Sequence, residues 1–190
     1  MTTASNERRR NIEGGIFLFL YCVTIPVANW MIGHVGTMCL ADGPCVVPVA
    51  PDLIAPSGVL MVGLALVLRD LVQRRLGTEF GVGAIFAGAV ISAGFSPHAI
   101  VLASASAFLT SELADFAVYT PLARRRLVLA VFASSVIGLV VDSIVFLWLA
   151  FGSLDFLTGQ IVGKFWMVLL SIPFVAYLRR RDERLGLQPA

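Results

Sequence analysis

Residues 111–119 read SELADFAVY and lie inside a run that is otherwise typical of a membrane helix. The apolar sequence AIVLASASAFLT, residues 99–110, precedes this stretch, and the basic sequence PLARRR, residues 121–126, follows it. A carboxylate in the apolar core of a bilayer is costly and usually faces a bundle interior or a water-filled cavity. Because Glu112 and Asp115 stand about one helical turn apart, the stretch predicts a helix that carries an acidic face into a polar interior.

The composition of the whole chain predicts a polytopic membrane protein. The chain has 190 residues, of which 58% are hydrophobic and only 14% are charged, and its mean hydropathy is +0.88. A soluble domain of this size would need far more polar surface. Since one span takes about 20 residues, we expect an all-α membrane protein with a single domain, residues 1–190, and six transmembrane helices. The expected helices cover residues 15–33, 56–72, 80–95, 98–120, 127–151 and 157–178.

Basic residues are concentrated in four clusters at alternate ends of these segments. The clusters are Arg8–Arg10, Arg69 with Arg74 and Arg75, Arg124–Arg126, and Arg179–Arg181 with Arg184. They fall before the first segment and after the second, fourth and sixth, and the expected outer loops contain no Lys or Arg. The positive-inside rule therefore predicts that both termini are cytoplasmic and that the protein is a multi-pass protein of the cell (inner) membrane. This distribution argues against nucleic-acid binding.

The longest expected outer loop covers residues 34–55. Its prolines predict either an ordered irregular chain or a short hairpin over the outer mouth, and an exposed linker is the alternative. Cys39 and Cys45 lie in this loop, and the sequence leaves open whether they form a disulfide or remain free thiols. The chain has no HExxH, GxSxG, CxxC or phosphate-loop motif. We therefore expect no enzyme activity, no cofactor and no metal.

Polar residues at helical spacing follow three of the expected helices. One face of the fourth segment carries Ser104, Phe108, Glu112, Asp115 and Tyr119; the fifth carries Ser135, Gly138 and Asp142; the sixth carries Gln160, Lys164 and Ser171. Three helices with one polar stripe each predict the walls of a cavity. We expect an outer-to-middle layer of Asn29, Asp142 and Lys164, and an inner layer of Glu112, Asp115 and Asp70.

These polar residues also allow structural interpretations. Asp142 and Lys164 would serve equally as an ion pair that only fixes the register of two helices. Asp70 would serve as a solvated partner of Arg69 or Arg74 at the membrane surface. Trp166 is either an interfacial aromatic residue or a stacking partner for a ligand.

The chain resembles the queuosine precursor transporter family, also called the VUT or YhhQ family. The resemblance rests on sequences spread along the chain: ANWM at 28–31, RDLVQRRLG at 69–77, SELADFAVYTPLARRR at 111–126, VVDSIVFLWLAF at 140–151 and GKFWMVLLSIPF at 163–174. It implies six spans and uptake of a 7-deazaguanine, such as preQ0 or preQ1, for salvage into tRNA queuosine. The implied partners are this nucleobase-like solute and the lipid bilayer, and homo-oligomerisation is left open.

The residue chemistry agrees with a guanine-like solute. Such a base presents a ring N–H beside an amino group, and a carboxylate accepts both. The candidates for this contact are Glu112, Asp115 and Asp142, whereas Lys164 and Asn29 are candidates for donating to the ring carbonyl. Candidates for stacking on the base are Phe108, Tyr119 and Trp166. Asp70 and Arg74 are candidates for gating or proton coupling.

Two other functions compete with this interpretation. A substrate-binding subunit of an energy-coupling-factor vitamin or nucleobase importer also has six helices, but its first segment often has an alanine repeat, which GIFLFLYCVTIPVANW, residues 15–30, lacks. A scaffold or assembly factor predicts no small-molecule binding and tolerance of substitution at Glu112 and Lys164.

Overall fold

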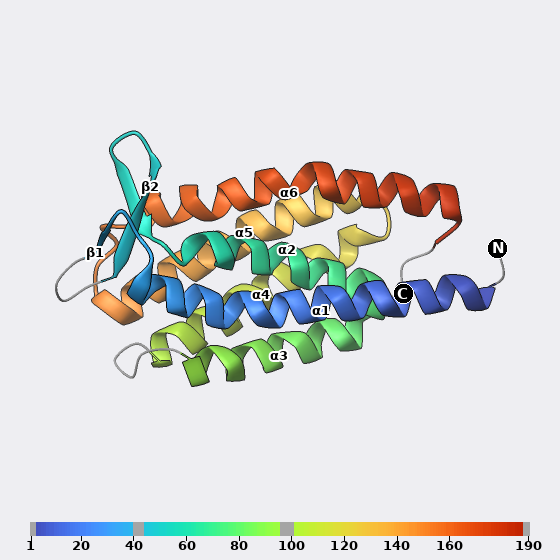
Figure 1. Ribbon diagram of the computed structural model, residues 1–190, viewed down its shortest axis with the longest axis horizontal. Coiled ribbons are helices and arrows are strands. Elements are labelled where there is room, and N and C mark those ends of the chain that lie inside the picture. The colour runs from blue at the N-terminus through green and yellow to red at the C-terminus, as the bar shows by residue number, and fades with distance from the viewer. Residues whose placement is uncertain (1–2, 40–43, 96–100, 188–190) are drawn as a thin grey trace.

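The computed structural model describes residues 3–39, 44–95 and 101–187. Six helices lie side by side along the long axis of the molecule, and a small sheet covers one end of the bundle (Figure 1). The helices are α1 (Thr3–His34), α2 (Val59–Leu76), α3 (Thr78–Phe95), α4 (Val101–Ala123), α5 (Leu127–Phe151) and α6 (Leu157–Leu185). Helix α1 begins and helix α6 ends at the end of the bundle opposite the sheet (Figure 1).

Helix α2 is the central helix of the bundle. It packs against all five other helices, and every one of its residues from Ala65 to Arg75 is buried. The apolar part of the core forms around it from Leu66, Leu71 and Val72 together with residues of the surrounding helices. The charged residues at the end of α2 are therefore enclosed by protein.

Five of the six helices are long and apolar enough to cross a membrane. They are α1 from Asn6 onward, α3, α4, α5 and α6. Helix α2 has 18 residues, as α3 does, and at about 1.5 Å per residue it is about 27 Å long. It differs in carrying four charged residues between Arg69 and Arg75. Composition thus supports five spans and a multi-pass membrane protein, with α2 as a charged helix enclosed by the other five.

The observed helices overlap all six predicted segments, and α5 coincides with the predicted 127–151. The largest differences are at α1, which begins at Thr3 and not near residue 15, and at α6, which continues past residue 178 to Leu185. Both extensions lie at the end opposite the sheet and are joined by an ion pair between Glu13 and Arg181 (2.6 Å). The expected start of the fourth helix, 98–100, lies outside the described residues.

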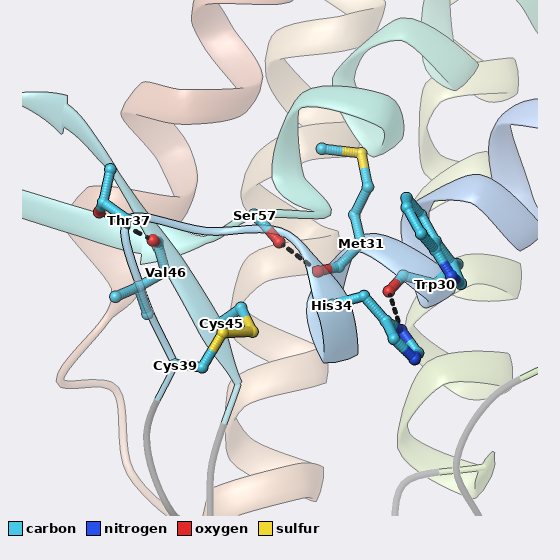
Figure 2. Close-up of a disulfide and its surroundings, with 8 residues drawn as sticks. All are labelled: Trp30, Met31, His34, Thr37, Cys39, Cys45, Val46 and Ser57. Atoms are coloured by element: carbon cyan, nitrogen blue, oxygen red, sulfur yellow. Dashed lines mark hydrogen bonds between the residues drawn. A yellow bond between two sulfur atoms is a disulfide. The ribbon is translucent and has the colours of Figure 1, made fainter.

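The long loop between α1 and α2 folds into an antiparallel sheet of three strands. They are β1 (Met38–Cys39), β2 (Cys45–Ala50) and β3 (Leu53–Pro56), in the order β1-β2-β3. This result excludes an exposed linker and extends the predicted hairpin by one strand. Figure 2 shows that a Cys39–Cys45 disulfide joins β1 to β2.

Two hydrogen bonds tie the sheet segment to the helices. The Ser57 hydroxyl donates to the Met31 carbonyl at 2.8 Å, which joins the start of α2 to α1 (Figure 2). The indole of Trp166 on α6 donates to the Val49 carbonyl of β2 at 2.8 Å. The sheet is therefore a fixed cover over one end of the bundle.

Candidate functional site

A cavity lies in the half of the bundle nearest the sheet, and all six helices contribute to its wall. The residues come from the second half of α1, the first half of α2 and α4, the last turns of α3 and α5, and the first turns of α6. Its polar lining consists of Thr24, Asn29, Ser92, Ser104, Ser111, Glu112, Asp142, Gln160 and Lys164. The cavity therefore combines apolar helix faces with a few polar groups, as small-molecule sites commonly do.

Lys164 organises one wall of the cavity. Its Nζ donates to Asp142 Oδ2 at 2.6 Å, to Ser143 Oγ at 2.8 Å and to Gln160 Oε1 at 2.7 Å. These contacts use all three donors of a lysine ammonium group. Lys164 is 1% exposed, so the pair with Asp142 is almost fully shielded from solvent. Because all three N–H groups of the ammonium are already bound, the residues around Lys164 are better placed to contact a molecule in the cavity.

Gln160 is such a neighbour, and sequence reasoning placed it on the polar stripe without assigning it to the site. Its carbonyl oxygen is held by Lys164, one helical turn away. The amide N–H groups are then the part of Gln160 that can donate to a molecule in the cavity. Gln160 could have been found from its four-residue spacing to Lys164, which places both on one face of α6.

Glycine allows α2 to approach this wall closely. A Cβ added at Gly63 would lie 2.5 Å from the carbonyl oxygen of Lys164. Any other residue at this position would therefore push α2 away from α6. The pair of Lys164 and Asp142 thus depends on a close backbone contact as well as on charge.

Beneath the cavity, the guanidinium of Arg69 on α2 binds two carboxylates of α4. Its Nε donates to Glu112 Oε2 at 2.9 Å, and its Nη2 donates to Asp115 Oδ1. Its Nη1 donates to Gln73 Oε1 at 3.2 Å and lies 3.1 Å from Asp70 Oδ1. Glu112 also lines the cavity, so this cluster of Arg69, Asp70, Glu112 and Asp115 continues its floor.

The position of Arg69 corrects its interpretation as part of a basic cluster at the membrane surface. Arg69 and Asp70 are both completely buried. They form an ion pair, as one alternative predicted for Asp70, but the pair is enclosed by protein and not solvated. The guanidinium also lies 5.8 Å from the ring of Phe116 and 5.7 Å from the ring of Tyr119, distances at which an aromatic face attracts a cation.

A second group of charges joins three helices nearer the end opposite the sheet. Asp182 of α6 accepts hydrogen bonds from Arg74 at 2.9 Å and from Arg75 at 2.8 Å, both on α2. Glu13 of α1 pairs with Arg75 at 2.9 Å and with Arg181 of α6 at 2.6 Å. Arg74, a candidate for gating, therefore belongs to a network that holds α1, α2 and α6 together at this end.

Apart from Arg74, which lies in the network with Asp182, the structure divides the predicted site residues into three groups. Asn29, Phe108, Glu112, Asp142 and Lys164 line the cavity. Asp115, Tyr119 and Asp70 are buried around Arg69, beneath the cavity. Trp166 lies on the outer surface, where its side chain is 48% exposed and its indole is bound to the sheet. Since Trp166 does not face the cavity, we remove it from the candidate binding set.

Comparison with known proteins gives one result. Residues 91–178, from the end of α3 through most of α6, match a family described as "Putative vitamin uptake transporter". The comparisons with curated proteins and with solved structures found no match. The matched region contains Glu112, Asp115, Asp142 and Lys164. The match supports a transporter family and a protein that is not an enzyme, and together with the apolar helices it points to a multi-pass membrane transporter of small molecules.

Proposed function

We propose that the chain imports a 7-deazaguanine precursor of queuosine, such as preQ0 or preQ1, through the cavity between its helices. The single observation that carries the proposal is the position of Glu112, a buried carboxylate that lines the cavity and is oriented by Arg69. The family match supports transport of a vitamin-like solute. The motif resemblance along the chain supports the narrower substrate class.

The groups that would bind the base are those with donors or acceptors not already used within the protein. Arg69 holds one oxygen of Glu112, so the remaining acceptor capacity of this carboxylate can receive the N–H and amino donors of the base. The amide of Gln160 can donate to the ring carbonyl. Lys164 and Asp142 neutralise each other at 2.6 Å, so the pair makes the wall polar without giving it a net charge.

Phe108 supplies an aromatic surface next to Glu112. It precedes Glu112 by one helical turn on α4, lines the cavity, and packs against Tyr21 with ring centroids 6.2 Å apart. Stacking of a base on an aromatic ring contributes about 1–3 kcal/mol in other base-binding proteins. A planar bicyclic solute between Phe108 and the carboxylate would use both groups.

We propose that the sheet faces outward and that both termini are cytoplasmic. Three observations support this orientation: the arginine clusters at the start of α1, after α4 and at the end of α6, the Cys39–Cys45 disulfide, and the position of the helix ends. The basic ends of α1 and α6 lie opposite the sheet (Figure 1), as the positive-inside rule expects for the cytoplasmic side. A disulfide in the sheet fits an oxidising outer compartment. Import then runs from the sheet end, past Glu112, toward the second group of charges.

The test is uptake in cells that cannot make preQ0 and lack their own importer. The chain is expressed alone, preQ0 or preQ1 is supplied at nanomolar concentration, and queuosine is measured in tRNA. Restored modification that is lost in Glu112→Ala, with the variant still folded in the membrane, is the expected result. Trp148→Ala serves as a matched control, because this side chain is 62% exposed on α5 and does not line the cavity.

Two outcomes would overturn the proposal in different ways. Restoration that survives Glu112→Ala would reject the site but keep the transport class. If tRNA queuosine is not restored although the protein is folded in the membrane, the substrate assignment is wrong. Co-purification with an ATPase module would then favour the energy-coupling-factor importer.

A further inference from the structure

The cluster around Arg69 contains more negative than positive groups. Arg69 contributes one positive charge, whereas Asp70, Glu112 and Asp115 together contribute three negative charges when ionised. All four side chains are at most 2% exposed. A buried carboxylate without a compensating charge is so unfavourable that it takes up a proton instead. The cluster therefore needs protons to remain buried.

Asp70 is the carboxylate that Arg69 supports least. Glu112 and Asp115 each accept a hydrogen bond from the guanidinium, on Nε and Nη2. Asp70 Oδ1 forms an ion pair with Nη1 at 3.1 Å, but it accepts no hydrogen bond from the described residues, whereas the hydrogen bond from Nη1 goes to Gln73. The other oxygen of Asp70 accepts from the Ser134 hydroxyl at 3.1 Å. A buried carboxyl that accepts one hydrogen bond from a neutral hydroxyl and none on its other oxygen is well suited to carry a proton.

The other buried charges near the cluster, within the described part of the chain, already have partners and do not balance Asp70. On α2, Arg74 and Arg75 are bound by Asp182 and Glu13. On α5, Asp142 is paired with Lys164 of α6. Helix α1 faces the cluster with Tyr21, and the only titratable side chain in α3 is Glu79, which is exposed. The surplus charge thus has to be neutralised within the cluster.

We propose that Asp70 is a proton-binding site and that its proton is co-transported with the substrate. Among the described residues, no group of three or more His, Cys, Asp or Glu side chains is arranged to hold a metal ion. The guanidinium occupies the space between the carboxylates, which disfavours a bound sodium ion. A proton adds to Asp70 Oδ1, converts the carboxylate into a neutral acid, and needs no further ligand.

This inference rests on the proposed function, and Arg69 links the two sites. The chain of contacts runs from the cavity through Glu112 to Arg69 and on to Asp70. The cluster joins α2 to α4 beneath the cavity, so opening a path toward the cytoplasmic end has to separate these groups. Water that enters then solvates Asp70, which ionises and releases its proton on the cytoplasmic side. Sealing the path again requires a new proton.

Infrared spectroscopy of the purified protein tests the proton without any substrate. At neutral pH the wild-type protein is expected to show the carbonyl stretch of a neutral, buried carboxylic acid. The band should lose intensity in Asp70→Asn, because the cluster has two carboxylates more than Arg69 can balance and Asp70 carries one of the two protons. It should be unchanged in Asp155→Asn, whose carboxylate is exposed. A wild-type spectrum without this band, or a band of unchanged intensity in Asp70→Asn, would overturn the assignment.

Transport in liposomes tests the coupling. With the membrane potential set to zero, a gradient of one pH unit, acidic outside, should drive about tenfold accumulation of preQ0 if one proton moves with each molecule. Asp70→Asn mimics the protonated residue, so it is expected to lose this response while it still exchanges internal for external preQ0. If wild-type exchange occurs but the gradient has no effect, the proton proposal is wrong. If wild-type exchange itself is missing, the substrate assignment is wrong, and the infrared result still decides whether Asp70 holds a proton.

A second variant covers the case in which Asp70→Asn fails to fold. Ser134→Ala keeps the carboxyl group and removes its hydroxyl donor. Because this donor favours the ionised carboxylate, its loss should move the pH at which the infrared band disappears to a higher value. An unchanged titration of the band in Ser134→Ala would contradict a proton on Asp70.

Discussion

Replacing Arg69 by alanine should lower the free energy of unfolding, because its guanidinium donates to two buried carboxylates and one buried amide. In Arg69→Ala, Glu112 and Asp115 each lose a charge-assisted hydrogen bond, the Gln73 carbonyl loses its guanidinium donor, and Asp70 loses its ion-pair partner. Hydrogen bonds to charged groups contribute about 1.5–3 kcal/mol each, and breaking a buried ion pair by removing one partner costs about 3–5 kcal/mol. Both lines of reasoning give a loss of about 4 kcal/mol in the free energy of unfolding.

The assay is thermal unfolding of the purified protein in detergent, followed by tryptophan fluorescence. For a chain of this length, about 4 kcal/mol corresponds to a decrease in Tm of about 10 °C. The loss should be smaller at acidic pH, where the orphaned carboxylates can bind protons. Arg179→Ala is the matched control, because its ion pair with Glu183 is exposed and such pairs contribute about 0–1 kcal/mol.

A second arm of this experiment distinguishes lost pairing from lost packing. Adding Glu112→Gln and Asp115→Asn to Arg69→Ala removes the unpaired charges while nearly keeping the side-chain volumes. This triple variant should recover part of the lost Tm. A Tm for Arg69→Ala equal to that of Arg179→Ala, or a triple variant no more stable than Arg69→Ala, would refute the reasoning.

Three other predictions concern the cavity wall, the outer cover and the stacking surface. Gly63→Leu should lower Tm by several degrees and abolish uptake, because its Cβ would lie 2.5 Å from a carbonyl oxygen of α6; normal uptake by this variant would contradict the close contact. A thiol reagent that cannot cross the membrane should label Cys39 and Cys45 from outside only after reduction, so labelling before reduction would argue against the disulfide. Phe108→Ala should raise the KM for uptake about tenfold through lost stacking, whereas Trp148→Ala, at an exposed position outside the cavity, should leave it unchanged; equal effects would remove Phe108 from the site.

The polar wall of the cavity could be predicted, because polar residues in apolar membrane helices usually face the interior of the bundle. The four-residue spacing of Ser104, Phe108 and Glu112 defines one face of α4, and Asp142 and Lys164 mark the corresponding faces of α5 and α6. Such faces turn toward each other, since lipid cannot solvate them. The cavity lining contains members of all three stripes.

The role of Arg69 was missed because depth along a helix is set by tertiary packing. Residues 69–75, RDLVQRR, end an apolar segment and are typical of an interfacial cluster. The sequence of this segment does not indicate where the neighbouring helices end. A usable signal existed, since Arg69 precedes Arg74 by more than one helical turn and stands next to an acidic residue. Trp166 could have been excluded from the sequence, because residues two apart on a helix point in nearly opposite directions and Lys164 faces the cavity.

Helix α2 explains why the charge pattern of this chain differs from a simple alternation of spans and loops. Its first half is apolar or small and forms cavity wall, with Gly63 against α6. Its middle carries Arg69 and Asp70 against α4 and α5, and its end carries Arg74 and Arg75 against α6. A helix exposed to lipid could not bear these charges, but this enclosed helix can, because α1, α4, α5 and α6 supply partners for them. The helix least suited by composition to span a membrane alone is therefore the one through which the cavity, the buried cluster and the charges at the far end are connected.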